Sequence, residues 1–155
     1  MQETLTRDDI VGKKIQRLWQ TPWKTIHGDN PDDYAVDVCS TFVELDDNTI
    51  FMIQWQDCFE ELPINRCVTL EKNWIEPDWE ELKTNSYGMI IVEVLTSKYI
   101  PTFCLLLNNN YILYDSDYGP FQTGPLISEL GEMYTIEDFS TYWGHNSFGV
   151  DITAW

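Results

Sequence analysis

Basic residues are scarce in this sequence, and their scarcity limits which partners the protein can have. Nine Lys and Arg stand against 26 Asp and Glu among 155 residues, a formal net charge of −17. A surface of that sign repels phosphate backbones and anionic lipid, which disfavours direct binding to nucleic acid or to a membrane. It attracts a basic partner and speeds the encounter with one. The alternative is that the acid only confers solubility.

Metal-binding side chains are also few. The sequence has two His, His27 and His145, and neither lies near a Cys. The Cys residues form no CxxC pair, and Cys39 and Cys104 lie in apolar, strand-like runs where a free thiol behaves as a small hydrophobe. We therefore expect buried thiols, no disulfide, no metal and no cofactor. The four Cys are Cys39, Cys58, Cys67 and Cys104.

Long apolar runs and a secretory leader are missing. The longest nearly uncharged apolar run, 99–107, contains Pro101 and falls short of the roughly 20 residues that span a bilayer. The opening "MQETLTRDDIVGKK" is polar and acidic where a signal peptide is basic and then apolar. We therefore expect a cytoplasmic protein.

Recognisable catalytic motifs are absent as well. The sequence contains no GxSxG, HExxH, P-loop or GxGxxG pattern, and neither His has an evident partner. Asp115 and Asp117 would share one face of an extended strand, but catalysis by paired carboxylates needs a defined separation in a cleft. We predict that the protein is not an enzyme.

The stretch "YILYDSDYGPFQTG", 111–124, has acids spaced as in a calcium loop. An EF-hand loop that starts at Asp115 requires an acid at its fifth position, Gly at the sixth and Glu at the twelfth. The sequence has Gly119, Pro120 and Leu126 there. We interpret the stretch as a strand end followed by a loop.

Apolar and aromatic residues are plentiful. They make up 43% of the chain, with 7 Trp, 8 Tyr and 7 Phe, enough for one domain, 1–155, that buries roughly 70% of its unfolded surface. The patterns predict an α+β fold, mostly a curved antiparallel sheet with two short helices; tandem β-meanders or a half-barrel would fit. Strands are predicted at 11–19, 35–45, 49–56, 66–72, 87–96 and 102–115 (a hairpin), helices at 77–83 and 135–144, and a helical turn at 6–10.

Two segments of the sequence look alike. "TFVELDDNTIFMI" (41–53) and "TFCLLLNNNYILY" (102–114) share Thr-Phe, an apolar strand, an Asn/Asp turn and an apolar return strand. They suggest two pseudo-repeated β-meander halves, about 11–61 and 87–121. Chance convergence of two hairpins is the alternative.

Aromatic residues stand beside carboxylates in several segments. Trp and Tyr anchor protein interfaces, and acids complement a basic surface, so these segments are candidates for partner contact. The alternative for any single Trp is ordinary packing in the core. The candidate residues are Asp57, Phe59, Glu60, Glu61, Trp74, Trp79, Glu80, Glu81, Asp115, Asp117 and Tyr118.

In its size, its acidity and its lack of catalytic motifs or a leader, the chain resembles the acidic cytoplasmic immunity proteins of bacterial polymorphic or contact-dependent toxin systems. The resemblance implies that it neutralises a basic toxin domain, often a nuclease, by occlusion. Three alternatives remain: a nucleic-acid mimic that decoys defence enzymes, a non-enzymatic β module with a housekeeping role, and an enzyme. Mimicry would require carboxylates spaced like phosphates along one face.

Overall fold

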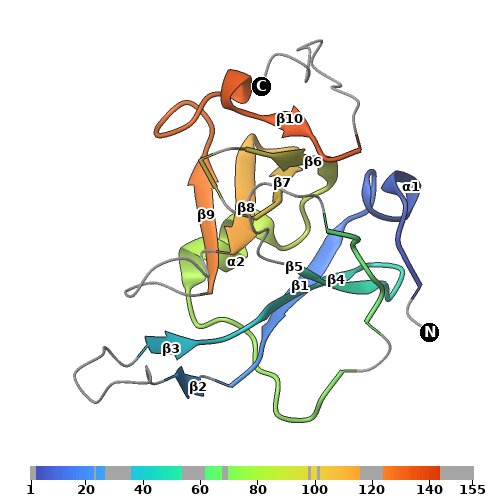
Figure 1. Ribbon diagram of the computed structural model, residues 1–155, viewed down its shortest axis with the longest axis vertical. Helices are drawn as coiled ribbons and strands as arrows, with labels where there is room; N and C mark the ends of the chain where they lie inside the picture. Colours follow the sequence, from blue (N-terminus) through green and yellow to red (C-terminus); the bar gives the residue numbers. More distant parts are fainter. Residues whose placement is uncertain are drawn as a thin grey trace.

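The computed structural model describes residues 3–22, 24–26, 36–53, 62–67, 70–97, 99–100, 102–115 and 124–143. Within them, antiparallel sheets of three and five strands form the body of the protein, with two short helices and a small two-stranded pair (Figure 1). These strands do not close into a barrel. The predicted α+β class, dominated by antiparallel strands, is confirmed.

The first sheet has the order β1-β4-β5, with β1 at Ile15–Gln20, β4 at Thr41–Leu45 and β5 at Ile50–Ile53. β2 (Lys24–Ile26) and β3 (Val36–Val38) pair separately and extend away from this sheet (Figure 1).

The prediction of one strand over 35–45 is therefore wrong, because β3 and β4 belong to different sheets. Ser40 donates its N–H to Oγ1 of Thr21 (2.9 Å), and its carbonyl accepts the N–H of Thr21 (3.0 Å). The Thr21 hydroxyl, rather than a backbone carbonyl, therefore accepts the Ser40 N–H. This bond interrupts the ladder of backbone hydrogen bonds at the junction of β3 and β4.

The second sheet has the order β10-β6-β7-β8-β9. The sequence patterns did not predict β9, because it opens with a proline; an edge strand tolerates proline at its first position. The strands are β6 (Ile91–Thr96), β7 (Cys104–Leu107), β8 (Tyr111–Asp115), β9 (Pro125–Glu129) and β10 (Ser140–Thr141).

The helices are shorter than predicted or displaced. α1 (Arg7–Ile10) matches the predicted turn at 6–10. α2 spans Glu80–Ser86 rather than 77–83, because Trp79 still has an extended backbone.

The predicted helix at 135–144 is wrong. Thr135 and Asp138 do form a capping box, but it caps a single 3-10 turn, Ile136–Asp138. The next residues pair with β6 as β10 instead of continuing the helix. The predicted strand at 66–72 is also wrong over its described residues, 66–67 and 70–72, where only Arg66 forms an isolated bridge.

The inner faces of the two sheets share one core. Leu18, Val43 and Phe51 from the first sheet lie in the same buried cluster as Val94 and Leu105 from the second. A smaller buried cluster lies on the other face of the second sheet, where Phe139 packs with residues of β6 to β8. Cys39 and Cys104 are buried, as predicted, whereas Cys67 is only partly buried.

The two similar segments both form hairpins, β4–β5 and β7–β8. Each turn contains an Asn with a left-handed backbone, Asn48 (φ 70°) and Asn110 (φ 67°), a conformation that Asn tolerates better than most residues. The proposed halves, about 11–61 and 87–121, extend at 54–61 and 116–121 beyond the described residues.

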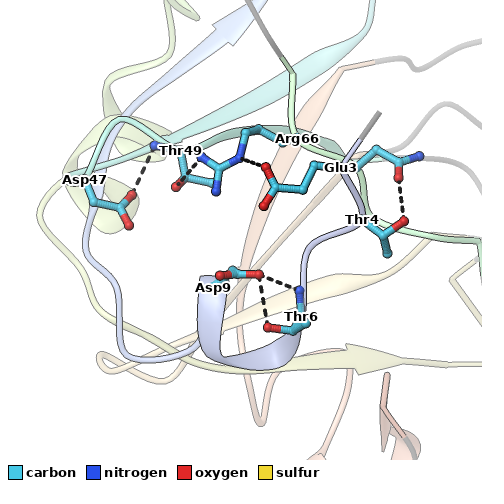
Figure 2. Close-up of polar contacts among 8 residues, drawn as sticks. Glu3, Thr4, Thr6, Asp9, Asp47, Thr49 and Arg66 are labelled. Atoms are coloured by element: carbon cyan, nitrogen blue, oxygen red, sulfur yellow. Dashed lines mark hydrogen bonds and ion pairs between the residues drawn. The ribbon is translucent and has the colours of Figure 1, made fainter. Parts of the chain in front are cut away.

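The N-terminal segment is attached to the first hairpin by polar contacts. Its backbone runs along 64–66, with Leu5 N–H donating to Ile64 O at 2.7 Å. Figure 2 shows the Arg66 guanidinium between Glu3 (3.0 Å) and the Thr49 hydroxyl (3.1 Å). These contacts place α1 beside the end of the first sheet.

The cap of α1 gives a pH-dependent prediction. Asp9 Oδ2 accepts the Thr6 N–H at 2.7 Å (Figure 2), and this bond lowers the pKa of Asp9 below its ordinary value of 3.8. D9A should lower the free energy of unfolding by about 0.5–1 kcal/mol near pH 7, because the carboxylate is partly exposed. Because the folded pKa is depressed, this stabilisation is present above pH 3.8 and is lost as the pH falls through the folded pKa.

Urea unfolding at about pH 7 and about pH 2 measures the effect of D9A. The matched control is D8A, which removes a charge from the same turn but no cap bond. Equal losses in the two variants, or a D9A loss that does not depend on pH, would contradict the assignment.

Candidate functional site

Residues 70–81, here termed the acidic strip, contain the predicted contact residues that the structure brings together. Trp74, Trp79, Glu80 and Glu81 all lie in it. The structure places Asp115 differently: it lies at the end of β8, opposite Pro125, and is only 3% exposed, which argues against direct contact with a partner. The other predicted contact residues, which lie outside the described residues, are Asp57, Phe59, Glu60, Glu61, Asp117 and Tyr118.

Two contacts hold the acidic strip against the first sheet, and a third joins it to Tyr87 at the end of α2. The ring of Trp74 stacks on Phe42 with centroids 4.0 Å apart. Ile75 exchanges two backbone hydrogen bonds with Gln20 at the end of β1, of 2.8 and 3.0 Å. Tyr87 donates its hydroxyl to Oε1 of Glu76 at 2.9 Å. The strip is therefore fixed in place before any partner arrives, which lowers the entropy cost of binding.

Apolar side chains of the strip face solvent. Leu70 is 41% exposed, Ile75 52% and Trp79 38%. Large exposed apolar side chains that cluster within one segment, with polar residues around them, are typical of a protein-binding surface. The acids of the strip, all exposed, are Glu71, Glu76, Asp78, Glu80 and Glu81.

α2 continues the strip and presents its last two acids. Glu80 and Glu81 occupy the first turn, where the helix dipole favours negative charge. Lys83 approaches Glu80 at 3.3 Å, but an exposed ion pair of this kind contributes little. Asn109 in the β7–β8 turn donates to the carbonyl of Asn85 at 2.9 Å, which ties the helix to the second sheet.

Further acids lie beside α2 on the second sheet. Burial raises the pKa of Tyr111, and Glu129, Glu81 and Glu132 raise it further. Glu81 is far from Glu129 and Glu132 in the sequence. The packing of α2 against β8 and β9 places all three near the hydroxyl of Tyr111. Sequence patterns missed Glu129 and Glu132 because no aromatic residue adjoins either of them.

Tyr87 is another residue that the sequence patterns missed. Burial raises the pKa of its hydroxyl to about 12; the nearby Glu76 raises it too, while the Leu18 N–H and Arg17 oppose the rise. The hydroxyl is therefore neutral and remains a donor to Glu76 at any physiological pH. No spacing rule connects Tyr87 with the strip, since it stands at the start of the next strand region.

The described residues contain neither a metal-binding cluster nor a membrane-spanning helix. Among the described residues, no three His, Cys, Asp or Glu side chains are grouped as metal ligands. Neither described helix has the length and apolar content needed to cross a bilayer.

The described part of the chain thus defines an α+β protein with an acidic, partly apolar surface segment on a sheet scaffold. Comparison with known proteins finds no matching family model, no similar curated protein and no similar solved structure.

Proposed function

We propose that this protein binds a basic protein partner through the acidic strip and α2. We further propose that it acts as an immunity-type inhibitor, which neutralises a basic toxin domain by occluding it. The observation that carries the proposal is the exposure of Ile75 and Trp79 on a fixed segment among carboxylates. Apolar anchors supply affinity at an interface, and the surrounding acids supply complementarity to Lys and Arg.

The surrounding charge supports this proposal. After Lys83 the sequence has one basic residue, Lys98, against eight acids. Within the strip itself, Lys72 is the one basic residue against five acids. Five of the described basic side chains already form ion pairs: Arg7, Lys13, Arg17, Arg66 and Lys83.

The arrangement favours a protein partner over mimicry of nucleic acid. Phosphate mimicry needs a regular row of carboxylates, whereas Ile75 and Trp79 stand between the acids of the strip. Occlusion also needs only a rigid, complementary surface and no catalytic group.

Capture of a partner from the native host by the full chain tests this function. We expect a stoichiometric basic protein that is released at about 1 M salt, because screening weakens contacts between charged surfaces. The strip variant D78N/E80Q/E81Q should slow association with that partner about tenfold at low salt.

The control D8N/D46N/E137Q removes the same charge from exposed positions outside the strip and should change the on-rate less than about twofold. Equal slowing in both variants would remove the strip from the interface. Failure to capture any basic, salt-sensitive partner would overturn the proposed function.

A further inference from the structure

The two sheets begin with reciprocal backbone contacts, which reveal matching positions in the two parts of the chain. Exchanging Gly12 with Gly88, and Ile15 with Ile91, converts each hydrogen bond of this set into another hydrogen bond of the set. A twofold rotation that relates the two sheets produces this pattern. The hydrogen bonds are Gly12 N to Ile91 O (2.8 Å), Gly88 N to Ile15 O (2.8 Å), Ile15 N to Met89 O (2.9 Å) and Ile91 N to Lys13 O (2.9 Å).

The matching of positions continues along β1 and β6, away from these four hydrogen bonds. β1 and β6 each have a register irregularity two residues from the start, at Arg17 and at Glu93. At their far ends Gln20 pairs with Ile75, and Thr96 pairs with Ser140. Ile75 therefore corresponds to Ser140, and the residues that precede them, Trp74 and Phe139, correspond as well.

The outer face of the second sheet is covered by the protein's own chain. Leu95, Cys104 and Tyr114 lie on this face and are buried. The 3-10 turn and the residues around it supply the cover. The covering side chains are Leu126, Leu130, Tyr134, Ile136 and Phe139.

The matching face of the first sheet is covered less completely. Trp19, Phe42 and Met52 lie directly opposite one another across β1, β4 and β5, and all three are only half-buried. Trp74 stacks on Phe42 as the counterpart of Phe139, but the counterpart of Ile136 is Glu71, which is exposed.

This face also contains an unused donor. The indole Nε1–H of Trp19 is buried and has no hydrogen-bond partner among the described residues. The guanidinium of Arg17 lies 5.8 Å from the centre of the same ring. A buried donor without an acceptor is costly, so the packing on this face is less complete than in the core.

We infer that this aromatic face, formed by Trp19, Phe42, Met52 and Trp74, receives an apolar anchor from a basic segment of the partner. The inference rests on the proposed function and names where and how the partner is held. Ile136 on the second sheet shows what the open position accepts: an aliphatic side chain beside an aromatic ring that is already in place, Phe139 there and Trp74 here. The acids beside the face select Lys or Arg around the anchor; they are Glu71, Glu76 and Asp78.

A peptide with the protein's own residues 130–142, with Lys in place of Glu132, Met133 and Glu137, is the probe; it keeps Asp138, which caps the turn. Titrated into the full chain, it should shift the indole N–H resonances of Trp19 and Trp74. Replacing Ile136 of the peptide by Ala keeps its charge and should weaken binding at least about tenfold.

On the protein, W74A should weaken peptide binding at least about tenfold. W74F keeps a ring to stack on Phe42 and should recover most of the affinity, which separates loss of the anchor site from loss of folding. The control M133A changes the most exposed apolar side chain, which lies outside this face, and should have no effect.

Equal binding of the Ala-substituted peptide, unchanged binding by W74A, or no binding of the Lys-substituted peptide would overturn the inference. Each of these results leaves the proposed function intact if association with the captured partner is still slowed by removing the acids of the strip. Absence of that slowing would overturn the proposed function itself.

Discussion

Replacing Arg7 by Met is expected to lower the free energy of unfolding by about 3 kcal/mol, because it leaves the carboxylate of Glu93 buried without its cation. Glu93 is 1% exposed, and Arg7 binds both of its oxygens, Nε to Oε1 at 3.2 Å and Nη2 to Oε2 at 2.8 Å. The Arg7 side chain is 39% exposed, so this figure lies at the lower end of the range for breaking a buried pair.

Urea unfolding of R7M measures this loss. R66M is the control, because it breaks an ion pair with the exposed Glu3 and a hydrogen bond to the neutral Thr49 hydroxyl, and it should cost about 1–2 kcal/mol. The double variant R7M/E93L should recover to within about 1 kcal/mol of the parent, since it removes both buried charges. An R7M loss no larger than that of R66M, or no recovery in the double variant, would contradict this account.

This ion pair joins the two parts of the fold. Arg7 belongs to α1, beside the first sheet, and Glu93 to β6 in the second sheet. The position that corresponds to Glu93 in the first sheet is Arg17, which pairs with Glu44 at 3.0 Å instead. The contact therefore has no counterpart across the twofold relation, and R7M tests one specific link between the sheets.

Replacing Leu82 by Ala should lower the free energy of unfolding by about 3 kcal/mol and should also slow binding to the partner. Leu82 is fully buried in the shared core, and Ser86 is the only other buried residue of α2. A helix this short has little stability of its own in water, so its position depends on that packing. Loosening it displaces Glu80 and Glu81.

Unfolding measurements and association rates with the captured partner check both effects of L82A. L82M keeps most of the side-chain volume and should cost less than about 1.5 kcal/mol. T84A changes an exposed residue of the same helix and should stay within about 0.5 kcal/mol of the parent. A loss in L82A as small as that in T84A, or an unchanged on-rate despite the full loss, would contradict the role given to α2.

Several elements followed directly from local sequence. The hairpins at 41–53 and 102–114 were predicted because apolar strands flank Asn and Asp residues that adopt the required turn, as Asn48 and Asn110 do. The capping box of Thr135 and Asp138 is equally local, because it involves only residues three positions apart.

The errors arose where contacts between distant segments overrode local preference. The predicted helix at 135–144 ends after one turn because Ser140 and Thr141 pair with β6. The predicted strand at 35–45 divides because Thr21 bonds to Ser40. Neither pairing leaves a trace in the local pattern of apolar residues.

The sequence alone determined the excess of acid and the α+β class, and it predicted the segment with Trp74, Trp79, Glu80 and Glu81 as a candidate contact. Charge and short-range patterns depend on composition and on neighbours along the chain, so they can be read without the fold. The tertiary structure decided that Asp115 is buried, that Ile75 is exposed, and that one sheet face is covered while its counterpart is half-open. Burial depends on which distant segments pack together, and for this reason only the folded chain separates the aromatic residues of the core from those that a partner can reach.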